Sequence, residues 1–313
     1  MYLVMSKFNK NDIKETFKNN DKKVIYFLSI IIMTILLMLI VNKTTYNLVS
    51  KSNNNQNINN NGNSITYKSS NEITKSTTKD SGEYTSTKSD ENALSVSGNI
   101  NANLSNINVS KSGDSNGGDN TSFYGTNSAV IAKSKATLTL DNITVKTNVT
   151  GANGVFCYGG SATTNNSSSD GTIINISNSK ITTTKDNSGG IMTTGGGVMN
   201  AKNLTIETSR TSSAAIRTDR GGGTVNVEKG TYKTNGQGSP TIYSTADVTV
   251  KSASLTATSS EGVVIEGKNK VTLNNVKLTD TNNKLNGKST TYKNIFLYQS
   301  MSGDAASGVS EFT

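Results

Sequence analysis

The chain has 313 residues, a formal net charge of +9 at pH 7, 32% hydrophobic residues, one Cys, and no Trp or His. Without histidine, a Ser-His-Asp triad, a Cys-His nucleophile pair and a His-ligated zinc site are excluded, and a single cysteine excludes an intrachain disulfide. So small an apolar fraction favours a thin, one-dimensional core over a compact globule.

Residues 24–41 form an uncharged apolar run of 18 residues, which is just long enough to cross a bilayer as a helix. Six lysines precede it, and few charges follow it closely. The positive-inside rule therefore places residues 1–23 in the cytoplasm and everything after residue 41 outside the cell. We expect a single-pass anchor in the cell membrane, with secretion after signal cleavage as the alternative.

Residues 42–91 are rich in Asn, Ser, Thr and Lys. Such a composition buries too little apolar surface to order itself, so it predicts a flexible extracellular linker. Within this segment, residues 82–86 can add a strand that caps the start of the repeats that follow.

An eight-residue pattern then recurs seven times between residues 102 and 278, at intervals of 36, 36, 25, 26, 23 and 23 residues. Each copy has two inward positions two residues apart, a polar step, and two more inward positions. The inward residues are Ala102, Leu104, Ile107, Val109; Leu138, Leu140, Ile143, Val145; Ile174, Ile176, Ser179, Ile181; Met199, Ala201, Leu204, Ile206; Val225, Val227, Gly230, Tyr232; Val248, Val250, Ala253, Leu255; and Val271, Leu273, Val276, Leu278. The spacing of two indicates strands, and the repeat indicates a solenoid.

The polar step ends in asparagine in five copies, at Asn106, Asn142, Asn178, Asn203 and Asn275, and in Lys229 and Ser252 in the other two. Asparagine tolerates the left-handed backbone of a sharp corner, and stacked Asn side chains can bond one coil to the next. The outward residue of the first pair is always Asn or Thr: Asn103, Thr139, Asn175, Asn200, Asn226, Thr249 and Thr272.

A third strand is predicted after each copy, at residues 130–132, 155–157, 190–192, 215–217, 241–243, 263–265 and 294–297. The whole pattern resembles the right-handed parallel β-helix of the pectate-lyase-like superfamily, whose two-residue corner carries an asparagine ladder. We therefore predict an all-β chain with a parallel β-helix over residues 92–313. The same fold carries adhesins, autotransporter passengers and phage tailspikes, so the resemblance leaves the activity open.

The C-terminal tail contains no eighth copy. Val309 would suit a first inward position, but Glu311, two residues later, would not. Two alternatives stay open: the tail folds over the end of the last coil, or the β-helix is truncated here and further coils follow in a longer protein.

Arginine occurs only at residues 210, 217 and 220, beside Asp219. Tyr243, on the third strand of the next coil, can stack above Arg217. Because a guanidinium group binds both carboxylate oxygens at once, Arg217, Asp219, Arg220 and Tyr243 are the predicted binding site for an acidic glycan.

The resemblance to pectate lyases implies a catalytic Arg or Lys with calcium-binding acids on such a surface. Asp219, Asp247, Glu261 and Glu266 lie on successive coils but share no strand position, so no metal site and no catalytic residue are assigned, although calcium stays open as a cofactor.

The other candidates have plainer interpretations. The long turns at 110–129 and 159–171 suit partner-specific contacts, where Tyr124 and Tyr158 either stack on sugar rings or pack internally. The glycines at 195–197 and 221–223 are interpreted as flexible turns, and Cys157 as a small buried hydrophobe.

The leading functional prediction is a membrane-anchored, extracellular, adhesin-like rod without catalysis, which binds a glycan or a host or cell-surface protein. The alternative is a polysaccharide-binding protein or a pectate-lyase-like polysaccharide lyase that uses the Arg217 turn. No nucleic-acid partner is expected, because no concentrated basic stripe with aromatic groups is present.

Overall fold

The computed structural model describes residues 57–58, 64–115, 117–161, 168–285, 290–299 and 304–313. The chain divides into two compact units, Met1–Asn55 and Gln56–Thr313, and every described residue belongs to the second. The predicted membrane segment at 24–41 lies outside the described residues. Within the described part of the chain, no helix is both long enough and apolar enough to span a bilayer.

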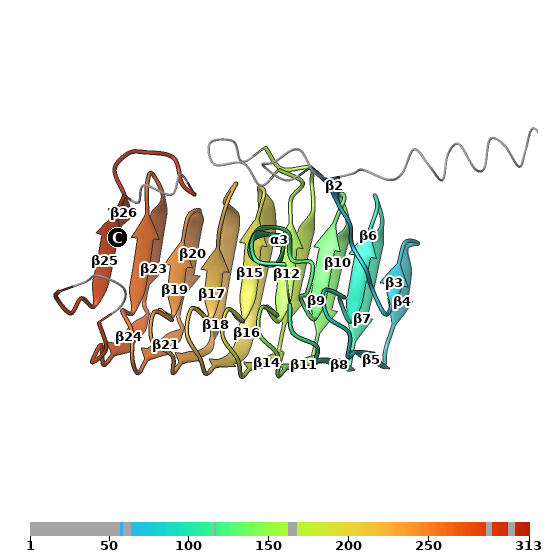
Figure 1. Cartoon of the computed structure of the whole chain (residues 1–313), viewed down its shortest axis with the longest axis horizontal. Helices are drawn as coiled ribbons and strands as arrows, with labels where there is room; N and C mark the ends of the chain where they lie inside the picture. The colour runs from blue at the N-terminus through green and yellow to red at the C-terminus, as the bar shows by residue number, and fades with distance from the viewer. Residues whose placement is uncertain (1–56, 59–63, 116, 162–167, 286–289, 300–303) are drawn as a thin grey trace, which may run out of the picture. The chain divides into compact units, whose positions relative to one another are not determined.

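The second unit is all-β and consists of parallel coils stacked on one another, each contributing a strand to three faces (Figure 1). The first face contains β4 (Thr77–Lys79), β7 (Asn101–Ser105), β10 (Thr137–Asp141), β13 (Ile173–Ser177), the first halves of β16 (Gly197–Thr208) and β18 (Gly223–Thr234), β20 (Asp247–Lys251), β23 (Lys270–Asn274) and β26 (Glu311–Phe312). The second face contains β5 (Gly82–Ser86), β8 (Ile107–Lys111), β11 (Thr144–Thr147), β14 (Lys180–Thr183), the second halves of β16 and β18, β21 (Ser254–Ala257) and β24 (Lys277–Asp280).

The third face forms a separate sheet. It contains β3 (Glu72–Ile73), β6 (Leu94–Ser97), β9 (Val130–Lys133), β12 (Val155–Tyr158), β15 (Ile191–Thr194), β17 (Ile216–Thr218), β19 (Ile242–Ser244), β22 (Val263–Glu266) and β25 (Ile295–Tyr298). All seven predicted third strands are therefore confirmed, with ends shifted by at most two residues. A short antiparallel pair, β1 (Asn57–Ile58) and β2 (Ser64–Ile65), precedes the coils.

The inward pattern is confirmed by burial. Every predicted inward residue is buried except Gly230, Leu273, Val276 and Leu278, which are half-buried. Successive coils align in strict register, so that Ala102, Leu138 and Ile174 are direct partners across neighbouring strands. Each coil thus buries its apolar side chains against the coils before and after it.

The corner residues all adopt the left-handed backbone conformation. Their φ values run from +50° at Asn178 to +62° at Lys229, and Asn106, Asn142, Asn203 and Asn275 fall within this range. The Nδ2 group of Asn142 donates to Oδ1 of Asn106, and that of Asn203 donates to Oδ1 of Asn178 at 3.0 Å. Between them, Asn178 donates to Asp141 at 2.8 Å, so the ladder runs in segments.

The stack begins earlier than residue 92. Strands β3, β4 and β5 lie in the segment predicted to be a flexible linker, and β5 pairs with β8 as the capping strand predicted at residues 82–86. This coil escapes the sequence pattern because Thr77 and Lys79 occupy the positions paired with Ala102 and Leu104. A terminal coil has a neighbour on one side only, so its inward positions need not be apolar.

The C-terminal tail pairs with the last coil. In β26, Phe312 is the register partner of the inward residue Val271. Val309 is 81% exposed, so the first inward position of the tail is occupied by Phe312 and not by Val309. Main-chain hydrogen bonds from Leu273 to Thr313 and from Thr313 to Val271 continue this pairing. Residues 311–312 therefore add one more parallel strand to the first face, an arrangement that fits both alternatives given for the tail.

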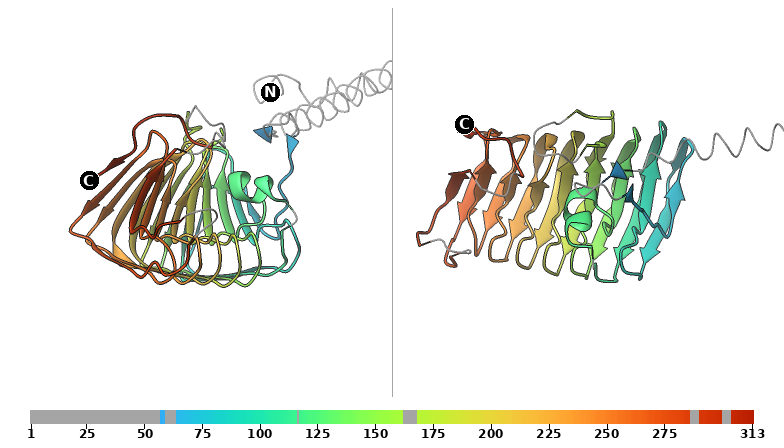
Figure 2. Two further views of the ribbon diagram at one scale, coloured as in Figure 1. Left: turned by 60° about the vertical axis from the view of Figure 1, so that its left-hand side comes forward. Right: turned by 45° about the horizontal axis from the view of Figure 1, so that its top comes forward.

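Helix α3 (Asp119–Tyr124) covers part of the outward side of the third face (Figures 1 and 2). Its aromatic side chains form a second apolar cluster with the outward residues of three successive third strands: Phe123, Tyr124, Ile131, Phe156 and Met192. The long 110–129 turn is thus folded back onto the stack.

Tyr124 and Tyr158 are 2% and 1% exposed and meet edge to face, with ring centroids 5.7 Å apart. Internal packing therefore accounts for both rings, and stacking on a sugar is excluded for them. Cys157 is buried, as predicted, and burial raises the pKa of its thiol to about 12.

Candidate functional site

A pocket of about 390 Å³ lies on the outward side of the third face, next to the area covered by α3. The outward row of this face changes character there. Under α3 the row is apolar, and Met192 is the last residue of this apolar part. Beyond Met192 the row continues through the register partners Arg217, Tyr243, Val264 and Phe296. These four residues line the pocket, because no helix covers them.

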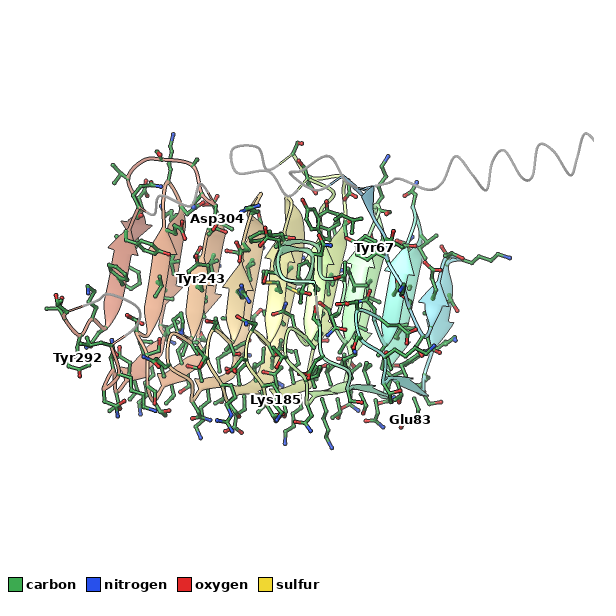
Figure 3. All side chains as sticks on the ribbon, viewed as in Figure 1. Tyr67, Glu83, Lys185, Tyr243, Tyr292 and Asp304 are labelled. Carbon is green, nitrogen blue, oxygen red and sulfur yellow. The ribbon has the colours of Figure 1, made fainter. Side chains whose placement is uncertain are left out.

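The walls of the pocket come from segments outside the repeat. Phe123 of α3 forms one wall, and Asp304 of the C-terminal segment forms another. Pro240 lines the pocket from the turn before β19, and Glu261 from the turn before β22. Figure 3 shows Tyr243 and Asp304 above the same part of the stack, with Lys185 and Glu83 along the opposite edge.

Arg217 and Asp219 form a largely buried ion pair. Nη2 of Arg217 lies 3.1 Å from Oδ2 of Asp219, and the two side chains are 12% and 7% exposed. Nη1 of Arg217 is also buried and has no hydrogen-bond partner among the described residues. Burial raises the pKa of Asp219 to about 6, although the Arg217 charge opposes this shift.

Arg220 connects the two walls. Its Nε donates to Oδ1 of Asp304 at 2.6 Å, and its guanidinium carbon lies 4.0 Å from the centroid of the Phe123 ring. Its main-chain N–H donates to Oδ1 of Asp219 at 3.0 Å. Arg220 thus holds α3, the C-terminal segment and the Arg217–Asp219 pair in one arrangement.

Two tyrosines bind the buried carboxylate of Glu266. The hydroxyl groups of Tyr243 and Tyr298 donate to Oε2 of Glu266 at 2.5 and 2.8 Å. The pKa of Tyr243 is raised, mainly by burial and to a smaller extent by the nearby carboxylates. Its hydroxyl group therefore stays protonated and serves as a donor. The rings of Phe296 and Tyr298 are stacked, with centroids 4.8 Å apart and planes inclined by 13°.

The structure brings the four predicted site residues together. Arg217, Asp219 and Tyr243 line the pocket, Arg217 and Tyr243 are register partners, and Arg220 holds the walls. Sequence reasoning missed Phe296 and Tyr298 on the third face. Phe296 could have been found, because it occupies the same outward position in its strand as Tyr243.

The acidic residues do not fit a calcium ion. No group of three or more His, Cys, Asp or Glu side chains suited to a metal occurs among the described residues. Asp219 and Asp304 are each paired with an arginine, and Glu266 accepts two phenol hydroxyls. Calcium requires six to eight oxygen ligands, and these carboxylates are already engaged elsewhere.

Acidification from pH 7.5 to 5 is expected to stabilise the wild-type protein, relative to the Asp219→Asn variant, by about 1 kcal/mol. The folded-state pKa of Asp219 is raised to about 6, above the ordinary value of 3.8 for an aspartate. The native state therefore binds this proton more tightly than the unfolded state does. The resulting stability is complete below about pH 4 and is lost as the pH rises through 6. Urea unfolding at both pH values measures the difference.

Asp141→Asn is the control, because hydrogen bonds from Ser177 and Asn178 lower the pKa of that surface carboxyl. Its contribution has the opposite sign and is lost only as the pH falls through this lowered pKa. A wild-type protein and an Asp219→Asn variant with identical pH profiles would contradict the assignment.

Comparison of the chain with models of protein families, with curated proteins and with solved structures found no match.

Proposed function

We propose that this chain is an adhesin-like surface protein that binds a neutral glycan in the pocket of the third face. The pocket combines partly exposed aromatic rings, at Tyr243, Phe296 and Tyr298, with the free N–H groups of Arg217 Nη1. Sugars present an apolar face that packs on aromatic rings and hydroxyl groups that take hydrogen bonds. The unpartnered buried guanidinium nitrogen is the observation that carries the proposal, since a ligand hydroxyl would satisfy it.

Charge favours a neutral sugar over the acidic glycan expected from the sequence. Both arginines at the site are already paired, Arg217 with Asp219 and Arg220 with Asp304. Glu261 and Glu266 add two further carboxyl groups at the pocket, and the described lining contains no further lysine or arginine to balance them. A carboxylate on the ligand would therefore meet excess negative charge in a poorly hydrated site.

Binding without catalysis is part of the proposal. The carboxylates of Asp219, Asp304 and Glu266 are held by arginine or tyrosine partners, an arrangement that orients a ligand and leaves no free acid–base pair among these three. Display outside the cell rests on the apolar run at 24–41 and the lysines before it. The asparagine corner supports a right-handed coil related to the pectate-lyase-like superfamily.

A glycan array probed with the full-length chain in detergent tests the proposal. We expect binding to neutral oligosaccharides, weakened about tenfold or more by Arg217→Gln, because a hydrogen bond to a charged group is lost. Lys185→Gln, on the opposite edge of the stack, is the control and should bind as the wild type does.

Three results would overturn the proposal. They are binding confined to acidic glycans, equal binding by wild type and Arg217→Gln, and unsaturated products formed from polygalacturonate. Thermal unfolding of each variant establishes that a lost signal reflects the pocket and not the fold.

A further inference from the structure

The outward side of the first face carries an uninterrupted row of amide and hydroxyl side chains. The seven Asn or Thr positions of the repeat lie in direct register, and the coil missed by the sequence pattern adds Thr78 as an eighth. The row consists of Thr78, Asn103, Thr139, Asn175, Asn200, Asn226, Thr249 and Thr272. Every member is at least partly exposed.

The rows on either side do not share this composition. One of them includes Asp141, Lys202, Glu228 and Lys251, and the other includes Ile173 and Asp247. Solubility alone accepts charged residues at such positions, as these neighbouring rows show. A row of eight uncharged hydrogen-bonding side chains therefore calls for a different explanation.

The middle of the row is hollowed. A second cavity of about 390 Å³ lies over Asn175, Asn200 and Asn226, with Thr139 and Thr249 at its two ends. Asn200 Nδ2 donates to Oδ1 of Asn175 at 2.9 Å, and Asn226 Nδ2 donates to Oδ1 of Asn200 at 3.0 Å. Each of these two donor amides uses one N–H in the ladder and keeps a second. Because the side chains are already ordered, a ligand meets a preorganised surface.

We propose that this row is a second binding site, which takes an extended neutral polysaccharide running along the axis of the stack. Neighbouring strands lie ~4.8 Å apart, so hydrogen-bonding groups recur at that interval. The sugar repeat of an extended, β-1,4-linked polysaccharide is of similar length, so successive sugars meet successive coils.

Other extended polymers fit less well. A peptide strand advances only about 3.3 Å per residue and falls out of register with the coils. A polyanion requires a concentration of cations, whereas Lys202 and Lys251 alternate with Glu228 beside the groove. The row also differs from the third-face pocket, since it offers many weak, equivalent contacts along its length.

This geometry predicts dependence on chain length. Each added sugar engages another coil at high effective concentration, so affinity rises with length until the ligand spans the row. Short sugars should be held by the third-face pocket and barely by the row. The two sites can therefore be told apart in one protein.

Affinity electrophoresis of the full-length chain in gels containing soluble glucomannan fractions of graded length tests the inference. We expect retention to increase with length. Asn200→Asp should weaken binding of the longest fraction by about three- to tenfold, because a carboxylate replaces the N–H donors in the middle of the row. Thr205→Asp, an exposed outward position on the second-face half of the same strand, β16, is the matched control and should retain wild-type binding.

Arg217→Gln separates the two sites, because it alters the pocket and leaves the row intact. Length-dependent retention that survives Arg217→Gln supports the inference, even where the pocket binds no sugar. Retention that is independent of length, unchanged by Asn200→Asp, or seen only with polygalacturonate overturns it.

Discussion

Replacing Tyr232 with alanine is expected to lower the free energy of unfolding by about 3–5 kcal/mol. Tyr232 is fully buried at an inward position of β18, between its register partners Ile206 and Leu255. The preceding inward position is Gly230, which contributes no side chain, so the tyrosine ring supplies the apolar volume of this half-coil. Truncation removes that volume and leaves a cavity that neighbouring coils cannot fill without shifting.

Tyr232→Phe separates the ring from its hydroxyl group. The hydroxyl donates to the carbonyl oxygen of Lys229 at 3.3 Å, and its loss should cost about 1 kcal/mol or less. Tyr292, which is 58% exposed, provides the surface control: Tyr292→Ala should change stability by less than about 0.5 kcal/mol. Urea denaturation measures all three variants. Similar losses for Tyr232→Ala and Tyr292→Ala would show that the core is not packed as described.

Gly221→Ala is expected to cost about 2–5 kcal/mol, because two effects add. The residue has a φ of +76°, where a Cβ atom is strained by about 1–2 kcal/mol. A Cβ there would also lie 2.2 Å from the carbonyl oxygen of Ser161 and 2.8 Å from the Cα atom of Gly195. These neighbours are backbone atoms of two other turns, so they cannot rotate away, and overpacking adds about 1–3 kcal/mol.

Gly171→Ala measures the strain without the clash. Gly171 has a φ of +97°, but a Cβ there would meet nothing within 4 Å. We expect a loss of about 1–2 kcal/mol, so the difference between the two variants reports the contact between turns. Equal losses in urea denaturation would refute that contact. The glycines at 195–197 and 221–223 are therefore needed for close packing between turns as well as for turn flexibility. A Cβ atom on Gly223, for example, would lie 2.3 Å from the carbonyl oxygen of Gly197.

The central coils were predictable because burial acts on them from both sides. Positions such as Leu138, Ile174 and Val248 each face a coil above and a coil below, so only apolar or small residues suit them. The corner was predictable for a related reason, since few residues other than glycine and asparagine accept a positive φ.

The ends of the stack follow weaker rules. Thr77 and Lys79 pair with Ala102 and Leu104 on one side only. Because no strand pairs with β4 on its other side among the described residues, an apolar side chain is not required at these positions. At the other end, the register of β26 depends on how the chain returns after Tyr298, which no periodicity records. Both boundaries were consequently misplaced or left open.

The pocket was half predictable. Arg217 and Tyr243 belong to the repeat, and their alignment follows from the equal position of each in its strand. Phe123 and Asp304 come from segments that lie outside the repeat and reach the pocket through tertiary contacts alone. The positions of Phe123 and Asp304 depend on the length and path of turns that occur once in the chain. Because these turns are not repeated, the sequence contains no periodic pattern that would predict where they lie.

The Arg220–Asp304 contact bears on the order in which the chain acquires its structure. Strand pairings join adjacent coils, but this ion pair spans 84 residues. Coil-by-coil growth forms local pairings first and leaves distant closures until last, because the intervening chain must already be ordered. We therefore expect the pocket to assemble late in folding, so that ligand binding requires an ordered chain from α3 to the C-terminal segment.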